Sequence, residues 1–155
     1  MNQADRAEEL FRQGYNCAQA GFGAFSQDLG LDSQEAMRLA SAFGAGLGKL
    51  REVCGAVSGM LMALGLARGY SDADAVGEKR ALYALTQQAV HQFETENGYL
   101  LCRDLLHLKK GEDLEEPAVR TEEYYQTRPC LKAVRSATAI AQSLLSDLPS
   151  GGPAV

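Results

Sequence analysis

The chain has 155 residues, of which 46% are hydrophobic, and its net charge is −5. This length and composition predict one globular domain. An acidic chain without a basic patch is a poor binder of nucleic acid or of an anionic membrane surface, so we expect neither as a partner. The longest uncharged run, Val53 to Ala67, is shorter than the roughly 20 apolar residues of a membrane span, and we interpret it as a buried helix.

Helical patterns follow one another along the chain, and no segment has a convincing strand pattern. The first helices are expected at residues 4–13, 16–30 and 32–43, with Asn16 and Asp32 or Ser33 as N-caps. The glycine-spaced segment GAGLGKLRE then leads into a helix over 54–69. A long helix is predicted at about 72–96, a short one at 101–108 and a last one at about 129–146.

These elements predict an all-α fold, a single-domain irregular bundle of about six or seven helices. We assign residues 1–148 to a helical four-cysteine domain and residues 149–155 to a disordered tail. The N-terminus lacks the basic and apolar segments of a secretory signal, which favours a cytoplasmic location.

The glycine spacing at Gly44, Gly46 and Gly48 is similar to that of a phosphate-binding loop. It lacks the Walker A pattern, however, and no strand precedes it as a dinucleotide fold would require. We therefore interpret it as a loop with positive φ angles that lets Cys54 approach other backbone. Gly59, in the following helix, is expected to permit close packing of a second helix.

The four cysteines, Cys17, Cys54, Cys102 and Cys130, all fall at or near predicted helix starts. The unpaired N–H groups and positive dipole end of a helix N-terminus favour a thiolate over a thiol. No two cysteines are close in sequence and there is no CxxC, so any shared site must be assembled by the fold. We expect Cys54 to be the most acidic thiol, because the glycine loop leaves its helix N-terminus open.

The remaining candidate residues carry weaker signals. His91 lies on a polar helix face and is expected to be solvated, whereas His107 is either a helix-end residue or a fallback metal ligand. Tyr124 and Tyr125 are interpreted as packing residues or a partner edge. No Ser-His-Asp arrangement can be argued, and the lack of CxxCH argues against covalent haem.

The chain resembles the C_GCAxxG_C_C family, which is described as redox-active because of its four cysteines. The matching segments are GYNCAQA around Cys17, CGAVSGMLMALGL from Cys54, LCRDLL around Cys102 and RPC ending at Cys130. They occur in the family's order and cover nearly the whole chain. A related domain in split-Soret cytochromes implies an iron–sulfur role.

These observations predict a redox protein whose four cysteines converge to bind an iron–sulfur cluster or other metal for electron transfer. In that hypothesis Cys17, Cys54, Cys102 and Cys130 are the redox cysteines and the metal and cofactor ligands. One alternative is a metal-free thiol–disulfide redox protein. Another is a zinc-stabilised or metal-free helical interaction module. We expect an unidentified redox partner, assign no specific enzyme reaction, and leave a homodimer as an open arrangement.

Overall fold

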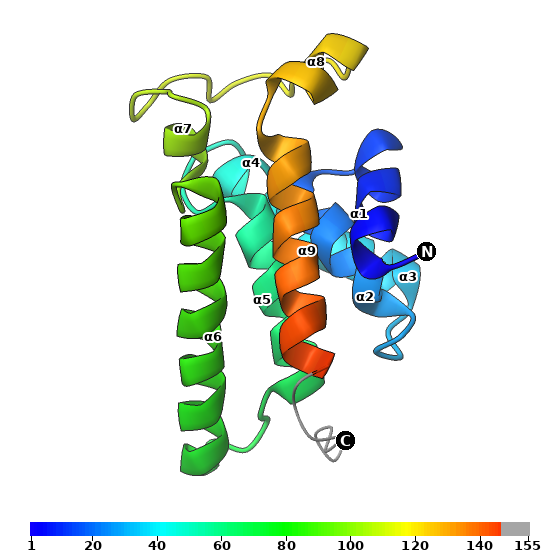
Figure 1. Ribbon diagram of the computed structural model, residues 1–155, viewed down its shortest axis with the longest axis vertical. Coiled ribbons are helices and arrows are strands. Elements are labelled where there is room, and N and C mark those ends of the chain that lie inside the picture. Colours follow the sequence, from blue (N-terminus) through cyan, green and yellow to red (C-terminus); the bar gives the residue numbers. More distant parts are fainter. Residues whose placement is uncertain (147–155) are drawn as a thin grey trace.

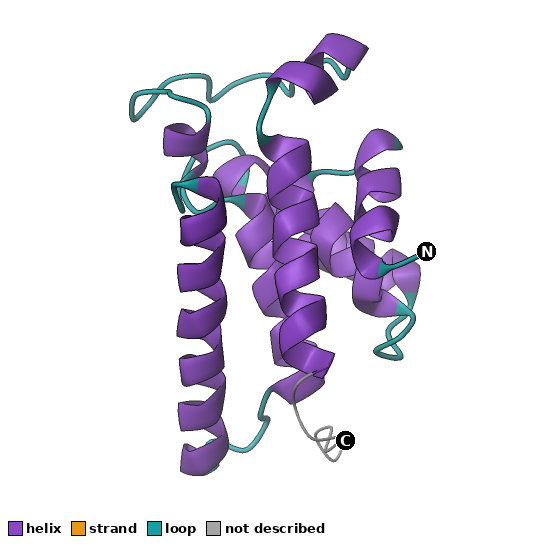
Figure 2. Cartoon of the chain, viewed as in Figure 1, coloured by secondary structure: helices purple, strands orange, loops and turns teal. Residues whose placement is uncertain are grey.

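The computed structural model describes residues 1–146, so the predicted tail at 149–155 lies outside the described residues. The elements in chain order are α1 (Gln3–Arg12), α2 (Cys17–Ser26), α3 (Ser33–Ala40), the 3-10 turn η1 (Ser41–Phe43), α4 (Gly44–Leu47), α5 (Gly55–Arg68), α6 (Val76–Asn97), α7 (Cys102–Leu105), α8 (Glu122–Thr127) and α9 (Cys130–Ser146). No strand is present in this part of the chain (Figure 2). The all-α prediction is confirmed, and the short helix α8 was not predicted.

Three helices, α5, α6 and α9, run side by side along the long axis of the molecule, with α1, α2 and α3 to one side (Figure 1). α5 and α9 both begin at the upper end of the bundle in this view, where α7 and α8 also lie. The helix starts that carry cysteines are thereby gathered at one end. No helix within residues 1–146 is long and apolar enough to cross a membrane.

The tightest crossing joins α5 to α2, and it depends on a glycine. A Cβ added at Gly59 would lie 2.7 Å from the Ala18 carbonyl oxygen and 3.0 Å from the Phe22 amide nitrogen. Both are backbone atoms of α2, so any side chain at this position would push the two helices apart. Gly59 itself is buried, which confirms the buried helix and the close approach predicted from the sequence.

Local sequence accounts for where the helices begin. The Asn16 side chain accepts a hydrogen bond from the Gln19 amide, and the Gln19 side chain accepts one from the Asn16 amide, forming a capping box at the start of α2. At the start of α3 the Asp32 side chain accepts a hydrogen bond from the Glu35 amide and so serves as the N-cap. Both predicted N-caps are confirmed, and the first of them places Cys17 at the first residue of α2.

The glycine-spaced segment is a left-handed turn. Residues 45–49 have φ angles between 53° and 74°, and Arg51 has a φ of 60°. The predicted positive φ angles are confirmed, but they also extend to Ala45, Leu47 and Lys49, for which this region costs about 1–2 kcal/mol per residue. Contacts elsewhere must offset this strain, and the buried charges described below supply them.

Candidate functional site

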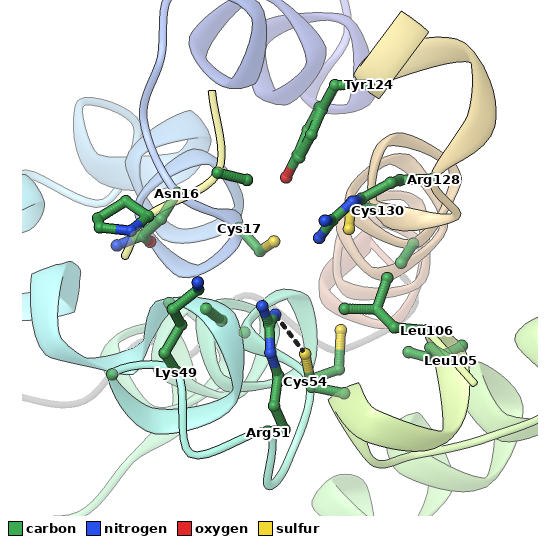
Figure 3. Close-up of a pocket in the computed structure, with 18 of the residues that line it drawn as sticks. Asn16, Cys17, Lys49, Arg51, Cys54, Leu105, Leu106, Tyr124, Arg128 and Cys130 are labelled. Carbon is green, nitrogen blue, oxygen red and sulfur yellow. Dashed lines mark hydrogen bonds between the residues drawn. The ribbon is translucent and has the colours of Figure 1, made fainter. Parts of the chain in front are cut away.

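All four cysteines line one cavity of about 460 Å³, and Figure 3 labels Cys17, Cys54 and Cys130 among its lining residues. Cys17, Cys102 and Cys130 are the first residues of α2, α7 and α9, and Cys54 is the N-cap of α5. The helix-start placement predicted from the sequence is confirmed for each of them. Four segments that are distant in sequence therefore direct their thiols toward one space.

Backbone pairing holds Cys54 and Cys102 beside each other. An isolated antiparallel bridge joins Val53 to Leu101, just before α5 and α7 begin. The Cys54 amide donates to the Leu100 carbonyl at 2.9 Å, and the Cys102 amide donates to the Glu52 carbonyl at 2.6 Å. Both helix starts are thus tied to one pair of extended segments.

Two glycines allow the backbone to close around these thiols. A Cβ at Gly46 would lie 2.7 Å from the Cys102 Cβ, and a Cβ at Gly55 would lie 3.1 Å from the Cys17 Cβ. The interpretation of the glycine loop as a close-approach segment is therefore supported, although Cys102 rather than Cys54 is the cysteine that Gly46 approaches. Gly46 and Gly55 thus permit close packing beside two of the cysteines.

A buried arginine contacts one of the thiols directly. Arg51 is 3% exposed, and its Nη1 donates to the Cys102 Sγ at 3.4 Å. Its Nη2 forms an ion pair with Asp113 at 2.6 Å, and Lys49, which is 8% exposed, pairs with the same carboxylate at 3.0 Å. Lys49 also donates to the Glu116 carbonyl. These ion pairs hold the acidic segment around Asp113 against the left-handed turn.

Two further arginines and a tyrosine approach the cavity from the other side. Arg120 donates to the Phe11 and Tyr15 carbonyls at 3.1 and 3.2 Å, and its guanidinium stacks on the Phe11 ring at 4.3 Å. Arg128 lies 5.0 Å from the centroid of the Tyr124 ring. The Arg128 guanidinium and the Tyr124 hydroxyl both point into the cavity (Figure 3). The charged residues that line the cavity are thus predominantly cationic.

Cys130 has the lowest pKa of the four cysteine thiols. A hydrogen bond from the Cys17 thiol, assisted by the Tyr124 hydroxyl and the charges of Arg128 and Arg120, lowers the Cys130 pKa to about 7 against the opposing effect of burial. The same hydrogen bond keeps the proton on Cys17, and together with burial it raises the Cys17 pKa well above its usual value. The two neighbouring thiols therefore have opposite tendencies to ionise.

The expectation that Cys54 is the most acidic thiol is wrong. Cys54 is 5% exposed, and burial raises its pKa to about 12. The amides of Ala56 and Val57 do stabilise its thiolate, as the helix-start argument requires, but burial outweighs them. Burial likewise raises the Cys102 pKa, with the Arg51 hydrogen bond and charge acting in the opposite direction.

A comparison with protein families agrees with this arrangement. The model of a family described as "putative redox-active protein (C_GCAxxG_C_C)" matches residues 15–144. The chain belongs to the C_GCAxxG_C_C family. Comparisons with curated proteins and with solved structures returned no match. Membership places the four cysteines of this cavity within a family described by its redox activity.

The thiols of this C_GCAxxG_C_C protein suit iron or zinc in donor chemistry, because Cys sulfur binds both. Among residues 1–146, however, no three His, Cys, Asp or Glu side chains are grouped as a single metal ion would require. Sulfur ligands must lie about 2.3 Å from such an ion, so single-ion binding needs side-chain rearrangement. Neither histidine contributes: His91 and His107 are exposed and do not line the cavity.

Sequence reasoning missed most of the polar residues at the site. Tyr124 was interpreted as a packing residue or a partner edge; it does pack against Phe11, and its hydroxyl also acts on Cys130. Arg51, Arg120 and Arg128 were not singled out. The sequence offers one signal for two of these arginines, namely their closeness to a cysteine: Arg128 stands two residues before Cys130, and Arg51 stands three residues before Cys54.

Proposed function

We propose that this protein is a dithiol–disulfide redox protein in which Cys130 is the attacking thiol and Cys17 the resolving thiol. The observation that supports this assignment is that both thiols line one cavity, at the first residues of α2 and α9, and that the Arg128 guanidinium and the Tyr124 hydroxyl point into the same cavity. The cationic and hydroxyl groups beside Cys130 favour its thiolate. The raised pKa of Cys17 keeps this thiol protonated while Cys130 attacks the substrate.

The proposed reaction exchanges two electrons. The Cys130 thiolate attacks one sulfur of a substrate disulfide RS–SR, forming a mixed disulfide Cys130–S–S–R and releasing the first RS⁻. The Cys17 proton passes to solvent or to the released thiolate. The Cys17 thiolate then attacks the Cys130 Sγ, which forms the Cys17–Cys130 disulfide and releases the second RS⁻. The substrate disulfide is reduced to two thiols and the protein dithiol is oxidised to one disulfide.

Mapping the disulfide that forms in a thiol–disulfide redox buffer tests this function. Mass spectrometry should find a Cys17–Cys130 disulfide, with Cys54 and Cys102 still free. Cys130→Ser should abolish the reaction, and Cys17→Ser should trap the mixed disulfide on Cys130. Cys54→Ser serves as the matched control and should still form the disulfide. A Cys54–Cys102 disulfide, or none at all, contradicts the assignment.

A second candidate is an iron–sulfur centre held by Cys17, Cys54, Cys102 and Cys130. It is favoured by the fact that four thiols, rather than two, surround the same cavity. A bound cluster would supply one-electron transfer. In this candidate the chain provides the four thiolates, and Arg51, through its bond to Cys102, stabilises the negative charge on that ligand.

Metal analysis of protein produced and purified without oxygen separates these candidates. Stoichiometric iron and sulfide, lost in each of the four Cys→Ser variants, supports the cluster. Zinc without sulfide supports a structural metal site in a helical interaction module. Metal-free protein that cycles between dithiol and disulfide supports the exchange reaction.

A further inference from the structure

We propose that the cavity binds a small anionic disulfide, carrying carboxylates, as the redox substrate, and that Arg128 is the residue that recognises its charge. This inference rests on the dithiol–disulfide function and names the substrate class for it. Three features of the cavity support it: its size, its charge and the fact that no ion-pair partner of Arg128 is found among the described residues.

The size of the cavity favours a small molecule over a protein. Cys17 and Cys130 are half-buried and line a recess of about 460 Å³, which the buried Cys54 and Cys102 also line. Cavities of roughly 300–1,000 Å³ are typical of small-molecule sites. A disulfide of low molecular weight suits a cavity of this size better than a disulfide held within a folded protein.

The charge of the cavity is opposite to that of the chain. The protein carries a net −5, yet four cations line the cavity, namely Lys49, Arg51, Arg120 and Arg128. Of the described residues that line it, one, Glu115, is a carboxylate. A concave surface of one charge concentrates ligands of the opposite charge and orients their approach.

Arg128 is the cation that remains available to a ligand. Arg51 and Lys49 are both paired with Asp113, and Arg120 is engaged by the Phe11 and Tyr15 carbonyls. No carboxylate in residues 1–146 lies within ion-pair distance of Arg128. Its guanidinium rests against the Tyr124 ring and points into the cavity (Figure 3).

The position of Arg128 would bring a bound substrate close to the attacking thiol, Cys130. It lies two residues before Cys130, at the extended segment between α8 and α9, and its charge acts on the Cys130 sulfur. A planar guanidinium binds a carboxylate in a bidentate manner. A substrate carboxylate held there would place the attached disulfide in the same recess as the attacking sulfur.

The test compares the rates at which two disulfides of opposite charge oxidise the reduced protein. Oxidised glutathione is the anionic probe and cystamine is the cationic probe, and formation of the Cys17–Cys130 disulfide is followed in both cases. Arg128→Gln is the test variant, and Arg80→Gln, at an exposed arginine of α6 outside the cavity, is the matched control. Because Arg128 also affects the reactivity of Cys130 toward any disulfide, the informative quantity is the ratio of the two rates.

We expect Arg128→Gln to lower the glutathione-to-cystamine rate ratio by about tenfold, the effect of losing a charged hydrogen bond, and Arg80→Gln to leave it unchanged. An equal ratio in wild type and Arg128→Gln overturns the recognition proposal while the exchange function stands. If neither probe oxidises Cys17 and Cys130, the exchange function fails and this inference fails with it.

Discussion

Cys130 should be the first cysteine to react with an alkylating reagent, and the advantage can be worked out from its surroundings. At a pKa of about 7, about half of Cys130 is thiolate at neutral pH. An ordinary thiol of pKa about 8.5 is about 3% thiolate at this pH. The gain in thiolate is about 15-fold, but a less basic thiolate is also a weaker nucleophile by about fivefold. Cys130 should therefore react about three times faster than a free cysteine at pH 7.

The difference in labelling rate between Cys130 and the buried Cys54 should be much larger. A thiol with a pKa of about 12 is almost entirely protonated at neutral pH, so Cys54 should remain unlabelled while Cys130 is consumed. The assay is iodoacetamide labelling across pH 5–10 with each site quantified by mass spectrometry, a range chosen around the reference thiol value. Cys17→Ala, which removes the first cause of the lowered pKa, should move the Cys130 midpoint to higher pH. Labelling of Cys54 before Cys130 would refute the reasoning.

Three further predictions concern stability. Gly59→Leu should lower the free energy of unfolding by about 1–3 kcal/mol through overpacking against α2, and unchanged thermal unfolding would contradict the buried crossing. Asp113→Asn leaves Lys49 and Arg51 without their shared carboxylate and should cost about 1–2 kcal/mol in chemical denaturation, a value reduced because Asp113 is itself partly exposed. The lowered Cys130 pKa means that this thiol binds more protons in the unfolded chain between pH 7 and about 9, so its own contribution to stability should grow with pH there. The raised pKa values of Cys17, Cys54 and Cys102 act in the opposite direction, so the measurement is the difference in unfolding free energy between wild type and Cys130→Ser, which should increase in favour of wild type from about pH 7 to 9.

The fold was accessible to sequence reasoning because its signals are local. Asn16 and Asp32 stand at their predicted caps, and the glycine-rich segment adopts the positive φ angles that its composition favours. The placement of the cysteines at helix starts followed from these boundaries. The interpretation of Gly59 also held, since a glycine within an apolar helix costs stability unless close packing offsets it.

The order of thiol acidity could not be read in the same way. The helix-start argument treated Cys54 and Cys130 alike, and the amides at the start of α5 do act on Cys54. What separates the two thiols is burial at Cys54 and the groups that reach Cys130 from other elements, Cys17 on α2 and Tyr124 on α8. Those contacts depend on tertiary packing, and sequence spacing gives no measure of either burial or distance across the bundle.

The two candidate functions draw on the same sulfur atoms and therefore exclude each other at any one moment. A Cys17–Cys130 disulfide removes half of the four thiolates that a cluster would need, while a bound cluster leaves no thiol free to attack. The surroundings differ between the two pairs: Cys130 lies beside Arg128, which has no ion-pair partner within residues 1–146, whereas the arginine beside Cys102 is already paired with Asp113. An attacking thiol requires access and a substrate-binding group, and a metal ligand requires a fixed position and charge compensation. The surroundings of Cys17 and Cys130 meet the first requirement and those of Cys102 meet the second, which favours the exchange reaction that we propose for Cys17 and Cys130.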